Sequence, residues 1–281
     1  MRSLPLRAAR ALVLIQLAAM ALLVGCKNAI LFHPSERPTT AEGLPALERT
    51  DARLLRVTRP DGRVLTGYDA RPPGGADTPL LLVFHGNAGN AAQRAPWLSG
   101  LVQRSGLRVV LASYSGYGGN PGSPSEEEIY ADALAFYDHL RASGVPPSQI
   151  VVYGESIGGG PASHVATERT CGGLILQSTL SSLSSMAWES FWWIPLASIV
   201  VSGDFPNAER AARATAMCPV LIVHGTNDGV VPFSEGEAIA KAAPDAEFMP
   251  IAGAGHNDLW YVGGANYLEQ VASRVRAWTA E

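Results

Sequence analysis

Short apolar runs alternate with longer amphipathic stretches along this chain, and the alternation predicts its main elements. The apolar runs have the length and β-branched content of buried strands. Amphipathic helices are predicted near residues 91–105 and 265–278. The predicted strands cover residues 54–58, 64–70, 80–84, 108–113, 151–153, 173–177, 219–225 and 247–251. Strands and helices alternating in this way indicate an α/β fold, with a mostly parallel sheet covered on both faces.

Local signals mark where several of these elements begin and end. Asp61-Gly62, between the first two predicted strands, is a strong hairpin signal. Ser125 and Glu128 form a capping box at the start of another helix, whose first turn carries three acids at its positive end. Gly144 is the predicted end of that helix.

One predicted strand runs directly into a G-x-S-x-G motif, Gly154-Glu155-Ser156-Ile157-Gly158. A strand followed by this motif indicates a sharp turn into a helix, with the serine hydroxyl at the apex. A side chain at either flanking glycine would clash in so tight a turn, and the serine adopts strained backbone angles. By itself the motif is equally compatible with a glycine-rich turn whose serine caps a helix.

An acid and a histidine follow in the order that makes the serine a candidate nucleophile. The strand at residues 219–225 leads into a loop with Asp228, and the strand at residues 247–251 leads into a loop with His256. A serine hydroxyl needs a neutral imidazole to take its proton, and a carboxylate fixes the imidazole tautomer. Serine, aspartate and histidine, each after its own strand, is the chain order of an α/β-hydrolase triad.

A candidate oxyanion hole lies upstream. The strand at residues 80–84 is followed by the loop 85–90, and such loops lend a backbone N–H to a developing oxyanion. The second predicted donor is the N–H of Ile157, at the start of a helix whose dipole favours negative charge.

From about residue 30 onward, the chain resembles the α/β-hydrolase superfamily. Within it, the sequence is most similar to the small-cap branch with an HGNAGN loop, described as serine aminopeptidase-like. The matching segments are HGNAGN at 85–90, YSGYGGNPGSPSE at 114–126, GESIGGG at 154–160, CPVLIVHGTNDGVVP at 218–232 and GAGHND at 253–258. The resemblance implies an α/β-hydrolase domain at residues 51–281, with an eight-stranded sheet and a short cap insertion. It implies the roles of nucleophile, acid, base and oxyanion donors for Ser156, Asp228, His256, Asn87 and Ile157.

Neighbouring polar residues offer alternatives to parts of this site. Asp258 is too close to His256 in sequence to orient its ring easily, and Asp204 lies in the predicted cap, where acids of this family do not sit. Glu155 is interpreted as a hydrogen-bonding brace, and His85 as a support for the oxyanion loop. The other four histidines have no metal-ligand spacing, so neither a metal site nor an organic cofactor is predicted.

Composition narrows the class of protein. The 281 residues are 47% hydrophobic and 16% charged, which suits one large domain and excludes general disorder. The formal net charge is −4, and a net negative charge does not favour binding to nucleic acid, so nucleic acid is not an expected partner. The expected partner is a small ester or acyl substrate, and the oligomeric state is left open.

The N-terminus has the pattern of a targeting segment. Three arginines precede an apolar run at residues 11–24, which is shorter than the roughly 20 residues needed to cross a bilayer. Residues 1–25, followed by Cys26, resemble a bacterial lipoprotein signal. That resemblance implies a lipidated Cys26, a tether at residues 26–50, and a place on the envelope facing the periplasm, with Lys27 favouring the outer membrane. An uncleaved short anchor with an incidental cysteine is the alternative.

Two cysteines precede adjacent predicted strands. A disulfide between Cys171 and Cys218 is geometrically conceivable in an oxidising compartment, where it needs Cα atoms within about 7 Å. Two buried thiols that act as small apolar residues are the other interpretation.

The predicted cap, residues 179–211, contains the aromatic segment 188–195. Its aromatics have three interpretations: lining an apolar substrate pocket, packing the cap on the core, or resting against a membrane.

These patterns predict a serine hydrolase that cleaves carboxylic ester or thioester bonds. An aminopeptidase-like amide hydrolase and a non-catalytic envelope protein that retains the fold are the alternatives.

Overall fold

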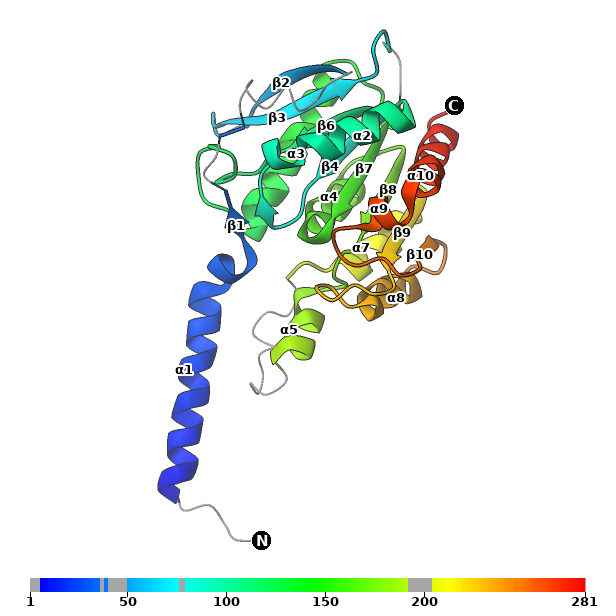
Figure 1. Ribbon diagram of the computed structural model, residues 1–281. Helices are drawn as coiled ribbons and strands as arrows, with labels where there is room; N and C mark the ends of the chain where they lie inside the picture. Colours follow the sequence, from blue (N-terminus) through cyan, green and yellow to red (C-terminus); the bar gives the residue numbers. More distant parts are fainter. Residues whose placement is uncertain (1–5, 36–37, 40–49, 76–78, 192–203, 281) are drawn as a thin grey trace.

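A twisted eight-stranded sheet forms the centre of the protein (Figure 1). The computed structural model describes residues 6–35, 38–39, 50–75, 79–191 and 204–280. The strands lie in the order β10-β9-β8-β7-β4-β6-β3-β2. They cover β2 (Asp51–Thr58), β3 (Val64–Arg71), β4 (Leu80–Phe84), β6 (Arg108–Ala112), β7 (Ile150–Glu155), β8 (Gly173–Gln177), β9 (Val220–Gly225) and β10 (Glu247–Ile251). The pairs β2–β3 and β3–β6 are antiparallel and the other pairs are parallel, which confirms the predicted fold class.

Helices cover both faces of this sheet. On one face lie α2 (Ala95–Ser105) and α10 (Gly264–Trp278); on the other lie α3 (Glu126–Ala142), α4 (Gly159–Glu168), α7 (Asn207–Ala214) and α8 (Phe233–Ala242). Side chains of β4 alternate between the faces: Leu81 and Val83 pack with α2 and α10, whereas Leu82 packs with the other layer. Each such fully buried side chain contributes roughly 1.5–3 kcal/mol through the hydrophobic effect.

The predicted capping box is half formed. Ser125 is the N-cap of α3, and its side chain accepts a hydrogen bond from the backbone N–H of Glu128. The carboxylate of Glu128 pairs with Arg59 and Arg63 at the β2–β3 hairpin. It therefore links α3 to the first two strands.

The N-terminal segment is helical well beyond the predicted signal. Helix α1 (Leu6–Leu31) continues through Cys26 and Lys27, so the first part of the predicted tether is helical. Among the described residues, no helix is long and apolar enough to cross a membrane. After α1, the short strand β1 (His33–Pro34) pairs with β5 (Ala88–Gly89) and joins this segment to the predicted oxyanion loop.

The cap lies between β8 and β9. Its described parts are residues 179–191, which include α5 (Leu183–Phe191), and the chain from residue 204 into α7. Residues 192–203, with half of the aromatic segment, lie outside the described residues. Trp188 is 66% exposed and therefore does not pack in the core. Buried Glu235 of α8 accepts hydrogen bonds from the N–H of Ser181 and the hydroxyl of Ser185, which fixes the start of the cap to the domain.

Cys171 and Cys218 are neighbours but are not bonded. Both are free thiols, and their sulfur atoms lie 3.7 Å apart at the starts of adjacent strands. A disulfide requires about 2.05 Å between the sulfurs. In this structure they are two buried thiols.

Candidate active site

The predicted serine lies at a strained turn between β7 and α4. Ser156 has φ of 56°, a left-handed value that is rare for residues other than glycine. A Cβ on Gly154 would lie 2.4 Å from the carbonyl oxygen of Gly158, and one on Gly158 would lie 2.2 Å from that of Phe84. Both flanking glycines are therefore required by close backbone approach, as the sequence predicted.

The structure brings together the three predicted triad residues from separate loops. Nε2 of His256 lies 3.1 Å from Oγ of Ser156, and Nδ1 of His256 lies 2.8 Å from Oδ2 of Asp228. The loops follow β7, β9 and β10, whose carboxyl ends share one edge of the sheet because these strands are parallel. The imidazole therefore joins hydroxyl and carboxylate in one hydrogen-bonded chain.

The surroundings of Asp228 hold it as a carboxylate. Burial by itself raises its pKa, but hydrogen bonds from His224, His256 and the backbone N–H of Val230 outweigh burial and lower the pKa well below its usual value. Its Oδ1 accepts the N–H groups of Val230 and Val231, each at 2.9 Å. The other oxygen is left to face His256. His224 was not predicted as a partner, and it lies 3.5 Å from Oδ2.

The loop after β4 packs directly against the serine. A Cβ on Gly86 would lie 3.3 Å from Cβ of Ser156. The N–H of Asn87 has no hydrogen-bond acceptor among the described residues. The N–H of Ile157 lies in the first turn of the helical segment after the serine, where backbone donors have no partner within the helix. Of the two predicted oxyanion donors, Ile157 therefore directly follows Ser156, and Asn87 follows Gly86 in the loop that packs against Ser156.

Two buried tyrosines hold the backbone of this loop by hydrogen bonds, a role that the sequence did not identify. The hydroxyl of Tyr114 donates to the carbonyl of His85 at 2.8 Å, and that of Tyr117 donates to the carbonyl of Asn87 at 2.7 Å. Both rings are fully buried. The only sequence signal for them is their place in the glycine-rich segment after β6, YSGYGGNPGSPSE at residues 114–126.

An ion pair braces the other side of the loop. Arg94 donates to both carboxylate oxygens of Glu155, at 3.2 and 3.3 Å, and to the carbonyl of Ala88 at 3.0 Å. Glu155 is therefore a brace, as expected, and Arg94 is the partner that sequence reasoning missed. Nδ1 of His85 donates to the carbonyl oxygen of Gly86 at 2.7 Å, and burial together with nearby Arg94 lowers the pKa of His85 to about 3. It is a neutral support of the loop.

The rival carboxylates have other partners. Asp258 accepts the N–H of Gly255 at 2.7 Å, and Asp204 forms an ion pair with Lys27 at 2.7 Å. Neither carboxylate is hydrogen-bonded to His256. Within the described residues, no cluster of three or more histidine, cysteine or acidic side chains has the arrangement of a metal site.

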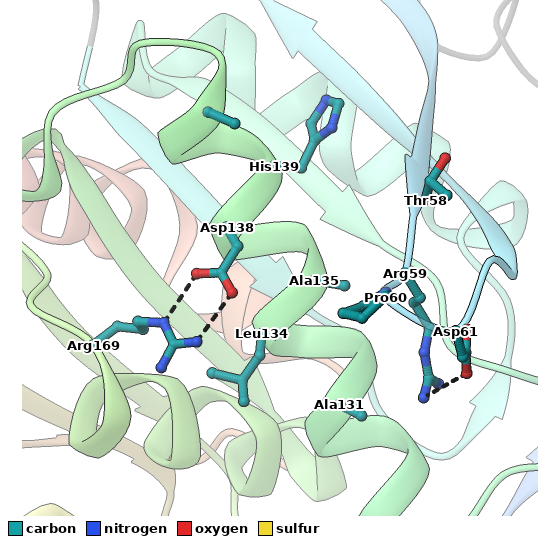
Figure 2. Close-up of a pocket in the computed structure, with 11 residues that line it drawn as sticks. Thr58, Arg59, Pro60, Asp61, Ala131, Leu134, Ala135, Asp138, His139 and Arg169 are labelled. Carbon is teal, nitrogen blue, oxygen red and sulfur yellow. Dashed lines mark hydrogen bonds and ion pairs between the residues drawn. The ribbon is translucent and has the colours of Figure 1, made fainter.

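Two cavities differ in their relation to the triad. The larger, of about 590 Å³, lies between α3 and the β2–β3 hairpin, where Figure 2 shows the Asp138–Arg169 ion pair in its wall. None of the triad residues lines it. A cavity of about 240 Å³ includes His256 in its wall, which makes it the better candidate for substrate.

Comparison with known proteins gives the class to which this chain belongs. Residues 79–200 match a family model described as the alpha/beta hydrolase fold. The chain belongs to the α/β-hydrolase superfamily.

Two curated relatives cover most of its length. An uncharacterized protein of Mycobacterium tuberculosis is 35% identical over 246 residues, spanning 86% of this chain and 84% of the relative. The alpha/beta hydrolase domain-containing protein 17C of Mus musculus is 34% identical, spanning 87% of this chain and 73% of the relative.

Solved structures agree on the fold. An alpha-beta hydrolase from Vibrio vulnificus has a TM-score of 0.71 at 22% identity and covers 97% of this chain and 95% of its own. An esterase from Pyrococcus furiosus has a TM-score of 0.65 at 17% identity, with coverage of 89% and 98%. At these identities, the likeness establishes the fold alone.

Proposed function

We propose that this protein is a serine hydrolase that cleaves carboxylic ester or thioester bonds by acyl transfer. The observation that carries the proposal is the hydrogen-bonded chain from Ser156 through His256 to Asp228, with distances of 3.1 and 2.8 Å. Structural neighbours described as esterases are consistent with this class.

In the first half-reaction, His256 accepts the proton of Ser156 as Oγ attacks the carbonyl carbon. Asp228 stabilises the imidazolium and keeps Nε2 directed at the serine. The N–H groups of Asn87 and Ile157 stabilise the negative oxygen of the tetrahedral intermediate. As this intermediate collapses, His256 protonates the departing alcohol or thiol, which leaves an acyl-serine.

In the second half-reaction, water takes the place of the leaving group. His256 removes a proton from water as the water oxygen attacks the acyl carbon. It then gives that proton to Oγ of Ser156 as the acyl–serine bond breaks. The carboxylic acid product departs and the serine is restored. These protein groups suffice for both steps.

A fluorophosphonate probe tests the nucleophile. We expect the wild-type protein to be labelled at Ser156 and to hydrolyse short p-nitrophenyl esters, whereas Ser156→Ala loses both properties. Ser143→Ala, at an exposed serine after α3, is the matched control and should retain both.

Each alternative predicts a different result. Equal rates for the wild type and Ser156→Ala, with intact folding and no labelling, would indicate a non-catalytic binding protein. Labelling with turnover of peptide amides but not esters would indicate the peptidase alternative.

We also propose that Cys26 is lipidated and holds the enzyme on the bacterial envelope, facing the periplasm. The arginine-rich start, the apolar run and Cys26 support this proposal.

A further inference from the structure

The cavity beside His256 has the size of a small cyclic group. Its volume is about 240 Å³. An apolar cavity of about 150 Å³ is large enough to bind benzene. The space therefore holds one ring with a short substituent.

Its walls combine two indoles with five polar side chains, those of Arg94, Glu155, Gln177, His256 and Asn257. Trp97 comes from α2 and Trp260 from α9 (Leu259–Val262), and both line the cavity together with His256. Trp260 is 41% exposed. Indole faces favour planar apolar groups.

One buried amide in the wall has an unused donor. Gln177, at the carboxyl end of β8, is only 7% exposed. Its Oε1 accepts hydrogen bonds from the hydroxyl groups of Tyr153 and Tyr267. Burial raises the pKa of both tyrosines, so both hydroxyl groups stay protonated and act as donors.

This arrangement fixes which end of the amide is free. Because the hydroxyl groups of Tyr153 and Tyr267 both donate to Oε1 of Gln177, Nε2 lies on the opposite side of the amide group. Among the described residues, Nε2 has no hydrogen-bond acceptor, although the side chain lines the cavity. Nε2 is therefore available to donate a hydrogen bond to an acceptor on a ligand in the cavity.

The charged groups in the wall are already paired with each other. Both carboxylate oxygens of Glu155 accept from Arg94, whose remaining terminal nitrogen donates to Ala88. A charged ligand would have to compete with this ion pair, whereas a neutral one would not.

We propose that this cavity binds the leaving group of the substrate, a neutral group of about one ring that bears a hydrogen-bond acceptor for Nε2 of Gln177. The proposal rests on the proposed hydrolase function. His256, which protonates the leaving atom, forms part of the wall, whereas Asn87 and Ile157 do not. The ring lies against Trp97 and Trp260, and Gln177 selects the acceptor.

Two acetate esters of similar shape test the acceptor. 4-Methoxyphenyl acetate carries an ether oxygen where 4-ethylphenyl acetate carries a methylene group. We expect wild-type kcat/KM to favour the methoxy ester by about tenfold. In Gln177→Met, the ratio of the two values should fall to near one, whereas Gln103→Met, on the exposed side of α2, should keep it. Equal wild-type values, or a preference retained in Gln177→Met, would overturn the proposal.

A second variant tests the location without touching the buried amide. Trp260→Ala should lower kcat/KM for both aryl acetates roughly tenfold more than for ethyl acetate, whose leaving group is too small to reach the indole. Tyr261→Ala removes an exposed neighbour outside the cavity and should not change this ratio. Equal effects of Trp260→Ala on aryl and ethyl acetates would also contradict the proposal.

These results are separable from a failure of the proposed function. A folded wild-type protein that hydrolyses none of the three acetates and takes up no fluorophosphonate refutes the hydrolase itself. A protein that is labelled at Ser156 but does not discriminate between the aryl esters refutes only the leaving-group site.

Discussion

At the scale of single residues, the site depends on keeping one carboxylate ionised in a buried place. Asp228 has no exposed side-chain surface, yet its pKa is lowered because His224, His256 and two backbone N–H groups face it. The same contacts orient His256 toward Ser156. Charge and orientation are therefore set by one group of hydrogen bonds.

Replacing this carboxylate should remove most of the activity. Asp228→Asn keeps the size of the side chain but favours the wrong imidazole tautomer, so kcat for p-nitrophenyl acetate should fall by roughly three to four orders of magnitude. Asp258→Asn, which changes a carboxylate bonded only to Gly255 N, should keep most of its activity. A larger loss in Asp258→Asn than in Asp228→Asn would show that the acid has been misassigned.

The lowered pKa of Asp228 also predicts how stability depends on pH. The unfolded state takes up a proton near the ordinary aspartate pKa, whereas the folded state resists protonation until lower pH. The contribution of Asp228 is thus complete above the unfolded pKa and is lost as pH falls toward the folded pKa. Chemical denaturation of the wild type and Asp228→Asn from neutral pH downward should show their difference in unfolding free energy shrinking in acid.

At the scale of elements, the proposed oxyanion loop, residues 85–90, is held by contacts from several parts of the chain. Tyr117 supports it through Asn87, Arg94 through Ala88, and β1 through its pairing with β5. These contacts fix the backbone whose N–H groups are to face the substrate.

Removing the Tyr117 hydroxyl, which supports this loop, should lower catalytic activity more than folding stability. Tyr117→Phe releases the carbonyl of Asn87, and a small shift of the donor weakens transition-state binding, so kcat should fall about tenfold with little change in KM. Tyr137→Phe loses an equivalent bond to the carbonyl of Thr170. Each variant should lose about 1 kcal/mol of stability. Equal kcat values in the two variants would refute a special role for Tyr117.

The turn around the serine should tolerate no added carbon. In Gly158→Ala the new Cβ meets the carbonyl of Phe84 at 2.2 Å, so β4 and β7 must separate, and we expect a loss of about 2 kcal/mol or more in urea denaturation. Gly100→Ala adds the same atom inside α2, where nothing lies within 4 Å, and should be neutral or stabilising by up to about 1 kcal/mol. A stable Gly158→Ala would contradict the close packing of this turn.

At the scale of the whole molecule, the three triad residues lie together at the edge of the sheet formed by the carboxyl ends of β7, β9 and β10. Figure 1 shows α1 extending away from the domain, and the Lys27–Asp204 ion pair links it to the chain before α7. Cys26, the proposed site of lipidation, therefore lies on a helix outside the sheet and its covering helices.

The proposed lipidation of Cys26 predicts where the protein is found. In a bacterial host, Cys26→Ser should lose labelling by an alkyne fatty acid and move from the membrane pellet to the soluble fraction, because two or more acyl chains are needed for stable anchoring. Cys171→Ser removes a buried thiol and should keep both properties. Continued sedimentation of unlabelled Cys26→Ser would favour an uncleaved anchor.

Much of this architecture could be predicted because its signals are local. The central strands are continuous apolar runs, and the triad is marked by residue type and chain order. The start of β2 was missed because Asp51 and Arg53 are polar edge residues, and β1 and β5 are too short to give a pattern.

The supports of the site could not be predicted, since they depend on distant contacts. Arg94 and Glu155 are 61 positions apart, and Tyr267 and Gln177 are 90 apart. No property of either residue alone identifies its partner. The sequence therefore predicted the reacting groups better than the residues that position them.

The left-handed backbone of Ser156 implies a conflict between durability and turnover. Glycine adopts such angles without steric cost, whereas a residue with a Cβ loses about 1–2 kcal/mol there. An inactive Ser156→Gly protein should accordingly melt at a higher temperature than the equally inactive Ser156→Ala. Selection for folding stability alone would favour glycine at this position. A serine here therefore lowers stability in exchange for the proposed reactivity of its hydroxyl.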